Sequence, residues 1–207
     1  MKIGFIGAGN VATTLGRHLL TAGHQIVLSN TRGPESLSGP VAELGEGASA
    51  GTREDAANCD VVVLATHWVH MRQALEGLTW HGQVLIDASN AHDRSPADFT
   101  PEGFARSIAA LGDTTSSEIV AKLTPGAKVV KAFSNMPMRW IQDFSKEKPG
   151  TVIFVASDHL DAKAVVISLI YDIGFAPVDT GGLAAGRIYQ IGAPLSGLDL
   201  HLVQRLH

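Results

Sequence analysis

Residues 2–20 have the sequence KIGFIGAGNVATTLGRHLL, in which a short apolar strand runs into a glycine-rich turn and then into a helix. The turn contains Gly7-x-Gly9-x-x-Ala12. In such a unit the first glycine permits the tight turn, the second lets a pyrophosphate approach the backbone, and a small third residue keeps the helix close to the sheet. The helix N-terminus then offers free N–H groups and a positive dipole end to phosphates. This stretch therefore predicts a dinucleotide-binding strand–turn–helix unit.

The rest of the chain alternates short apolar runs with amphipathic stretches. The runs are rich in β-branched residues and lack the period-2 alternation of half-exposed strands, which is typical of buried parallel strands. This alternation predicts an α/β fold of the Rossmann type, with a doubly wound, mostly parallel sheet and a short C-terminal helical appendage. The predicted strands are 2–6, 25–29, 60–65, 83–88, 128–133 and 151–156, and the clearest helices are 10–22, 53–58, 69–77 and 159–173.

The composition limits the classes of function. The chain has 207 residues, of which 45% are hydrophobic and 17% charged, and its net charge of −4 with scattered Lys and Arg argues against a nucleic-acid surface. One cysteine, Cys59, allows no intramolecular disulfide and no multi-cysteine metal site. No apolar run approaches the roughly 18 residues of a membrane span, and residues 2–6 already form a core strand rather than a signal peptide. We therefore expect a cytoplasmic protein that binds neither nucleic acid nor a membrane.

The end of the second predicted strand bears on the choice of nucleotide. About 20 residues after the glycine turn, an NAD site usually carries a carboxylate that binds the ribose 2′-OH and repels a 2′-phosphate. Here the sequence is Ser29-Asn30-Thr31-Arg32, which supplies hydroxyl and amide groups and one guanidinium. Arginine binds phosphate bidentately and stacks on adenine. The sequence therefore predicts NADP(H) as the preferred cofactor.

Further strand ends should face the same crevice, because ligands of such sheets lie beyond the carboxyl ends of the strands. LATHW (64–68) is expected under the pyrophosphate and the nicotinamide ribose, and DASNAHD (87–93) near the nicotinamide. Ser134 follows another predicted strand and is placed to contact the nicotinamide amide. The predicted cofactor-binding residues are Gly7, Gly9, Asn10, Val11, Ala12, Ser29, Asn30, Thr31, Arg32, Ala65, Thr66, His67, Ala88, Ser89, Asn90 and Ser134.

The second half of the chain carries a more specific likeness. SSEIVAKLTPGAKVVKAFSNMP (116–137) and VIFVASDHLDAKAVVISLIYDIGFAPVDTGGLAAGRI (152–188) resemble the NADPH-dependent oxidoreductases typified by F420H2:NADP oxidoreductase, and also the reductase domains of the STEAP metalloreductases. The resemblance covers essentially the whole chain. It implies hydride exchange between NADP(H) and a flat tricyclic acceptor, either the deazaflavin coenzyme F420 or, as in the STEAP branch, a flavin (FMN or FAD).

The chain departs from the family pattern at three places that bear on the acceptor. His67 precedes Trp68 where relatives often carry a proline, and Ser134-Asn135 stands where the family has Asn-Thr. HDRSPADF (92–99), on the expected acceptor side, fits no pattern of the family.

Few side chains are candidates for chemistry, because a ring that stacks on the nicotinamide needs orientation more than acid–base groups. His67 could donate a proton or bind a phosphate, and Asn135 could contact the nicotinamide or the acceptor. Lys131 lies in an apolar strand, where it is expected to pair with a carboxylate such as Asp87 and to support the site. His67 and His70 lack a third ligand, so no metal site is predicted.

Two other functions use the same nucleotide half. An imine, pyrroline or small-carbonyl reductase would need an acid or base beside the nicotinamide, with His67, His92 or Lys131 as candidates, and a pocket completed by a dimer partner. An NADPH-sensing module would bind the nucleotide and reduce nothing. Acceptor-dependent oxidation of NADPH separates the sensor from the enzymes, and the chemistry of the acceptor separates the two enzymes.

The chain is expected to form one NADP-binding domain over residues 1–180 with a short helical tail, 181–207, as part of the same unit. The tail holds apolar residues that the body need not bury, and we expect them to form part of a homodimer interface. They are Leu195, Leu198, Leu200, Leu202 and Val203.

Overall fold

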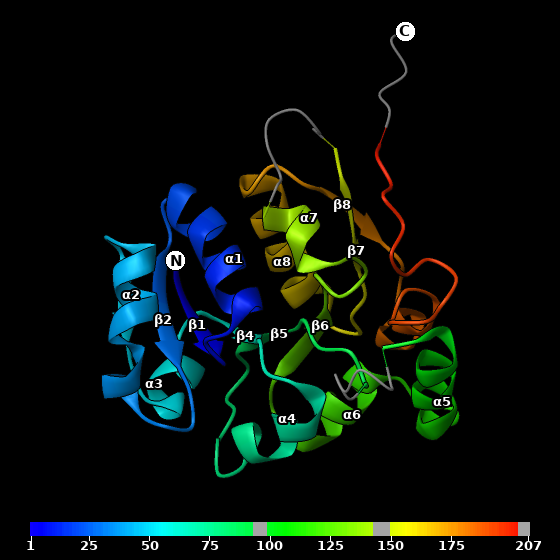
Figure 1. The fold of residues 1–207 in the computed structure, drawn as a ribbon, viewed down its shortest axis with the longest axis horizontal. Coiled ribbons are helices and arrows are strands. Elements are labelled where there is room, and N and C mark those ends of the chain that lie inside the picture. Colours follow the sequence, from blue (N-terminus) through cyan, green and yellow to red (C-terminus); the bar gives the residue numbers. More distant parts are fainter. Residues whose placement is uncertain (93–98, 143–149, 203–207) are drawn as a thin grey trace, which may run out of the picture.

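A computed structural model describes residues 1–92, 99–142 and 150–202, and its centre is a six-stranded parallel sheet (Figure 1). The strand order is β3-β2-β1-β4-β5-β6, so the direction in which the chain crosses the sheet reverses between β1 and β4. Ligands of such sheets bind at that reversal, beyond the carboxyl ends of the strands. The strands are β1 (Lys2–Ile6), β2 (Gln25–Ser29), β3 (Ala48–Ala50), β4 (Val61–Leu64), β5 (Val84–Asp87) and β6 (Lys128–Lys131).

Helices cover both faces of this sheet, with α1, α7 and α8 on one side and α3, α4 and α6 on the other (Figure 1). Successive strand residues point to opposite faces. Phe5 and Val63 therefore join the core beneath α1 and α8, whereas Ile6 and Leu64 join the core beneath α3 and α4. The helices are α1 (Asn10–Thr21), α2 (Ser38–Leu44), α3 (Arg53–Ala57), α4 (Trp68–Leu75), α5 (Pro101–Leu111), α6 (Ser116–Leu123), α7 (Met138–Gln142) and α8 (Leu160–Asp172), with 3₁₀ helices η1 (Pro34–Leu37) and η2 (Leu183–Ile188).

A second, two-stranded parallel sheet lies beside β6 and consists of β7 (Val152–Val155) and β8 (Ala176–Asp179). It is joined to β6 by an antiparallel bridge, in which Lys131 and Ala156 exchange backbone hydrogen bonds of 2.9 and 3.1 Å. The sequence predicted 151–156 as one more parallel strand, and β7 is parallel to its ladder partner β8 but meets β6 only at this antiparallel bridge. An apolar run indicates that a strand is buried, but it carries no information about the strand's direction.

Two strands escaped prediction because their residues have weak β propensity. β3 is Ala48-Ser49-Ala50, and it forms by pairing with β2. β8 contains Pro177, which has no N–H to give to a ladder. The helices agree more closely with prediction, because their caps are local. Thr115 stands three residues before Glu118 in the sequence, a spacing that predicts a capping box, and the two residues form one at the start of α6 with donor–acceptor distances of 2.7 and 3.2 Å.

The C-terminal segment folds back onto the β7–β8 sheet, and its helical part is the 3₁₀ helix η2. Tyr189 is completely buried there, with its ring centroid 5.3 Å from that of Phe154. Leu198 and Leu202 are exposed, whereas Val203 lies outside the described residues. Across the three described ranges, no helix is long and apolar enough to cross a membrane.

Candidate functional site

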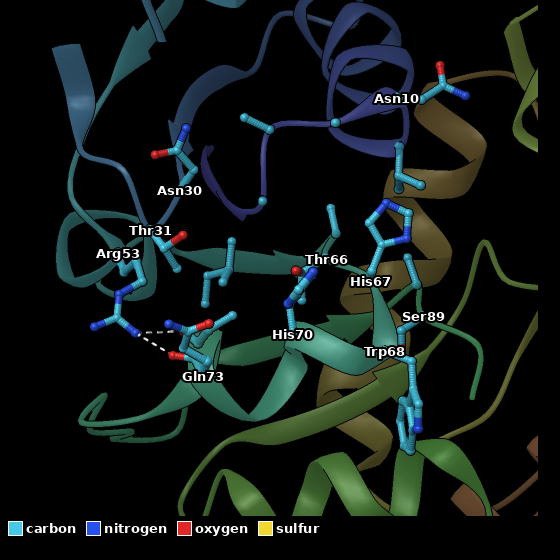
Figure 2. Close-up of a pocket in the computed structure, with 18 of the residues that line it drawn as sticks. Asn10, Asn30, Thr31, Arg53, Thr66, His67, Trp68, His70, Gln73 and Ser89 are labelled. Carbon is cyan, nitrogen blue, oxygen red and sulfur yellow. Dashed lines mark hydrogen bonds between the residues drawn. The ribbon is translucent and has the colours of Figure 1, made fainter. Parts of the chain in front are cut away.

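A cavity of about 470 Å³ lies beyond the carboxyl ends of β1, β2, β4 and β5, at the reversal of strand order (Figure 2). Most of the predicted cofactor-binding residues line it, and they come from four separate strand–helix connections. They are Gly7, Gly9, Asn10, Val11, Asn30, Thr31, Arg32, Ala65, Thr66, His67, Ala88, Ser89 and Asn90.

Four predicted site residues lie outside the lining of the cavity. Ala12 is completely buried in α1, where it packs in the core. Ser29 is also completely buried, and its Oγ donates to the carbonyl oxygen of Phe5 at 2.7 Å. Ser134 and Asn135 are buried behind the cavity, and Asn135 Nδ2 donates to Val152 O at 3.3 Å. The structure thus gives these four residues packing and hydrogen-bonding contacts with the protein interior.

The two glycines of the first turn serve different purposes. Gly7 has φ +111°, and a Cβ there would lie 2.4 Å from the carbonyl oxygen of Ala65, so this glycine is required by the fold itself. Gly9 has φ −89°, and a Cβ there would meet no protein atom within 4 Å. The absence of a side chain at Gly9 therefore leaves space on the cavity side, where a phosphate can approach the backbone.

The N-terminus of α1 borders the same space. Gly9 caps the helix without a side-chain hydrogen bond, and the first turn contains no acidic residue. The first N–H groups of the twelve-residue helix are therefore free of a side-chain cap, and the helix dipole favours an anion there. A diphosphate fits the chemistry of this end of the cavity.

The turn after β2 forms the far end of the cavity. Asn30 Oδ1 accepts from Arg32 N at 2.8 Å, and Asn30 Nδ2 donates to Ser36 Oγ at 2.9 Å. This side-chain bridge shapes the turn, which leaves the exposed side chains of Thr31 and Arg32 at the cavity edge. Arg53 and Gln73 complete that end of the cavity (Figure 2).

The charge of the cavity is opposite to that of the chain. The lining includes the arginines Arg32 and Arg53 and the histidines His67, His70 and His92, and none of the described lining residues is a carboxylate. The whole chain has a net charge of −4. A cavity that concentrates cationic groups on an acidic protein favours an anionic ligand.

A buried charge network supports the opposite end of the cavity. The Asp87 carboxylate accepts three hydrogen bonds, from Ser89 N at 2.9 Å and from the hydroxyls of Ser89 and Ser117 at 2.6 and 2.5 Å. Lys131 Nζ donates to Ser89 O at 3.2 Å and to Ser116 Oγ at 3.1 Å. Ser89, which lines the cavity, is thus held through its N–H, its carbonyl and its hydroxyl.

The pairing of Lys131 with Asp87 confirms the prediction made from strand alternation: the two charged groups lie 3.8 Å apart, and both side chains are completely buried. Burial lowers the pKa of the Lys131 ammonium, and the Asp87 carboxylate acts in the opposite direction. The C-terminal segment covers the lysine, because a Cβ on Gly186 would lie 2.6 Å from Lys131 Cδ.

Asn90 connects the cavity to the C-terminal segment. Its Nδ2 donates to Ser134 O at 2.9 Å, and its Oδ1 accepts from Ile191 N at 2.8 Å. Among the described residues, the buried Oγ of Ser134 and Oδ1 of Asn135 have no hydrogen-bond partner. Phe133, directly before them, has φ +59°, a conformation that is strained for an aromatic residue.

The start of α4 contributes His67, Trp68 and His70 to the lining. In Figure 2 the ring of His67 points toward the start of α1, whereas Trp68 points in the opposite direction. In the described part of the chain, no group of three His, Cys, Asp or Glu side chains could hold a metal ion.

Arg53 and Gln73 are the main lining residues that the sequence analysis missed. The helix containing Arg53 was predicted, but β3, which places that helix beside β2, was not. An arginine or glutamine at the end of a helix carries no signal of its own without this topology.

A family model described as NADP oxidoreductase, coenzyme F420-dependent, matches residues 2–91. Metalloreductase STEAP3 of Rattus norvegicus is 26% identical over 190 residues, which are 90% of this chain and 35% of that protein. The chain thus spans about a third of the length of its curated relatives.

Among the similar solved structures, two match over most of their own length as well as most of this chain. A hypothetical protein of Sinorhizobium meliloti is 39% identical with a TM-score of 0.86, covering 98% of this chain and 97% of that one. A candidate F420-dependent NADP reductase of Arthrobacter sp. FB24 shares the fold at 23% identity, with a TM-score of 0.69 and coverage of 90% and 87%. With the glycine turn and the parallel sheet in agreement with the family match, residues 2–91 of the chain belong to the family of coenzyme F420-dependent NADP oxidoreductases.

Proposed function

We propose that the protein binds NADP(H) in this cavity and transfers hydride between it and a ring-type acceptor such as coenzyme F420 or a flavin. The observation that carries the proposal is the cavity itself, which joins a glycine turn with open space at Gly9 to an arginine-containing end without carboxylates. Both features match a phosphorylated dinucleotide, and the family is one of NADP oxidoreductases.

Each wall of the cavity has a role in this proposal. The start of α1 binds the diphosphate through the N–H groups beyond Gly9, and Thr31 and Arg32 bind the phosphorylated adenosine ribose. Ala88, Ser89 and Asn90 form the wall at the nicotinamide end, where NADPH supplies a hydride when bound. The network beneath Ser89 keeps that wall rigid, which fixes the orientation on which hydride transfer depends.

The acceptor in this proposal stacks over the nicotinamide end and needs no dedicated acid. His67 lies in the wall, where it can bind a phosphate or the acceptor through its ring nitrogens. Ser134 and Asn135 lie behind Asn90, and the hydrogen bond from Asn90 Nδ2 to Ser134 O supports a role in shaping this end of the cavity. Of the segment 92–99, whose sequence fits no family pattern, only His92 and Phe99 lie within the described residues.

We further propose that the protein is a cytoplasmic homodimer, in which residues 1–180 form the NADP-binding domain and the following tail contributes to the interface. Exposed apolar side chains on the C-terminal segment, Ile188, Leu198 and Leu202, support this assembly. A dimeric mass by light scattering at micromolar concentration is the expected result, and a monomeric mass would contradict it.

The experiment follows the absorbance of NADPH at its nicotinamide band, with purified protein and separate additions of F420, FMN, FAD and a cyclic imine. Oxidation with F420 or a flavin, and much slower oxidation of NADH, is the expected result. Oxidation with the imine alone would instead assign the protein to the imine reductases. Tight binding of NADPH without oxidation by any of the four would favour a sensor.

A further inference from the structure

Arg53 occupies a position at the adenosine end that the glycine and ribose motifs do not predict. It is the first residue of α3, which follows β3, and β3 pairs in parallel with β2. The carboxyl ends of these two neighbouring strands therefore lead to the same edge of the sheet. Arg53 lies at the same end of the cavity as Asn30 and Thr31 (Figure 2).

The guanidinium of Arg53 is fixed on one side by the protein. Its Nη1 donates to the carbonyl oxygens of Gln73 at 2.9 Å, Ala74 at 3.2 Å and Glu76 at 3.2 Å, which belong to the last turn of α4 and its C-cap. The side chain is 25% exposed, so it forms part of the wall. An arginine held in this way loses little conformational entropy when it binds a ligand.

The other edge of the guanidinium, formed by Nη2 and Nε, makes weaker interactions with the protein. All side-chain hydrogen bonds that Arg53 makes to the described residues use Nη1. Nη2 lies 3.7 Å from Glu54 Oε1, a carboxylate that is 60% exposed, and such a surface pair contributes little. A guanidinium has five N–H donors in a rigid fork, so Nη2 and Nε are left to bind an anion bidentately.

We propose that Arg53 is a specificity-determining residue, which binds the 2′-phosphate of NADP(H) together with Arg32. This inference rests on the proposed function. The two arginines differ in how firmly the protein holds them before a ligand binds. Arg32 lies on an exposed turn, whereas Arg53 is hydrogen-bonded to the end of α4. The 2′-phosphate is a dianionic phosphomonoester, and its charge matches that of two guanidinium groups. The diphosphate of the cofactor binds elsewhere in this proposal, at the start of α1.

The test measures dissociation constants by calorimetry for NADPH, NADH, 2′,5′-ADP and 5′-AMP with wild type, Arg53→Gln, Arg53→Lys and Arg32→Gln. Arg17→Gln is the matched control, because Arg17 is an arginine of α1 that pairs with Glu43 on the surface, outside the cavity. Circular dichroism and a melting curve of each variant establish that it is folded.

If Arg53 contacts the 2′-phosphate, Arg53→Gln should raise the dissociation constants of NADPH and 2′,5′-ADP by about tenfold or more. This is the size of the effect of one charge-assisted hydrogen bond. NADH and 5′-AMP should bind as to the wild type, and Arg53→Lys should fall between. Equal losses for NADPH and NADH would overturn the proposal, because they indicate an adenine contact or a distorted α4. Unchanged binding would overturn it as well. If the wild type binds none of the four ligands, the proposed function itself fails, which is a separate result.

Discussion

Lys131 and Asp87 stand directly opposite each other on the neighbouring parallel strands β6 and β5, with Nζ 3.8 Å from Oδ2 and both side chains completely buried. Buried charges are tolerated when they are paired and hydrogen-bonded, and here three serines complete the network. The pair holds the peptide of Ser89 beneath the cavity wall. Stability and site geometry therefore depend on the same two residues.

Removing one partner of the Lys131–Asp87 pair should destabilise the folded protein. We expect Asp87→Asn or Lys131→Met to lower the free energy of unfolding by roughly 3–5 kcal/mol, because each leaves one buried charge without its partner. The double variant should be less destabilised than the sum of the two single changes, since neither charge remains. Urea unfolding measures the free energy of unfolding of the two single variants and of the double variant.

A matched control is available on the same strand. Lys128 pairs with Asp161 on the surface, with side chains that are 36% and 64% exposed. Lys128→Met should therefore change the stability by about 1 kcal/mol or less. Single changes at the buried pair that cost no more than this control would refute its structural importance.

The lowered pKa of Lys131 has a consequence in alkaline solution. Between that lowered pKa and 10.5, the ordinary pKa of a lysine side chain, the unfolded chain binds a proton that the folded chain has released. Stability contributed by this group therefore rises with pH in that window. The free energy of unfolding of the wild type, minus that of Lys131→Met, should increase with pH in alkaline solution up to pH 10.5. A flat or falling difference would mean that burial does not lower this pKa.

The two glycines of the first turn should respond differently to alanine. Gly9→Ala should fold with wild-type stability to within about 1 kcal/mol, because its Cβ meets no protein atom, but should weaken NADPH binding at least tenfold by filling the phosphate space. Gly7→Ala should lower stability itself, because its Cβ collides with Ala65 O in a backbone that favours glycine. Melting curves and NADPH titrations measure both effects. Unchanged NADPH affinity in folded Gly9→Ala would place the phosphates elsewhere.

His67 provides a test of how much acid–base catalysis the site uses. A positioned general acid contributes about 10²–10⁴-fold to a rate. If stacking geometry dominates, His67→Gln should keep kcat within about tenfold of the wild type, measured with NADPH and F420 or FMN. A larger loss of kcat at unchanged NADPH affinity would assign His67 a catalytic role.

The parts of the fold that could be predicted from sequence are those with local causes. The glycine turn at Gly7 and Gly9 follows from adjacent residues, and the Thr115 capping box spans three positions. The Lys131–Asp87 pair was predictable because strand alternation and neighbouring strands bring the two side chains together.

The remaining features arise from contacts between distant segments. Arg53 reaches the cavity through the pairing of β3 with β2, and the sequence of β3 has too little β propensity to signal a strand. Asn90 accepts a hydrogen bond from Ile191, 101 residues further along the chain. Ser29 lies at the expected position, but its side chain bonds Phe5 O in the sheet, a direction that the motif alone does not set.

The cover that Gly186 places over the Lys131 side chain also bears on the order of events during synthesis. A ribosome completes every strand of the main sheet once residue 131 has been made, yet the side-chain stem of Lys131 lacks the cover of Gly186 until that residue emerges and packs against it. The last step in closing the buried network therefore waits for more than fifty later residues. We expect a nascent chain that ends before η2 to carry a hydrated lysine and a loosely held Ser89, and to gain its rigid nucleotide wall only when that helix arrives.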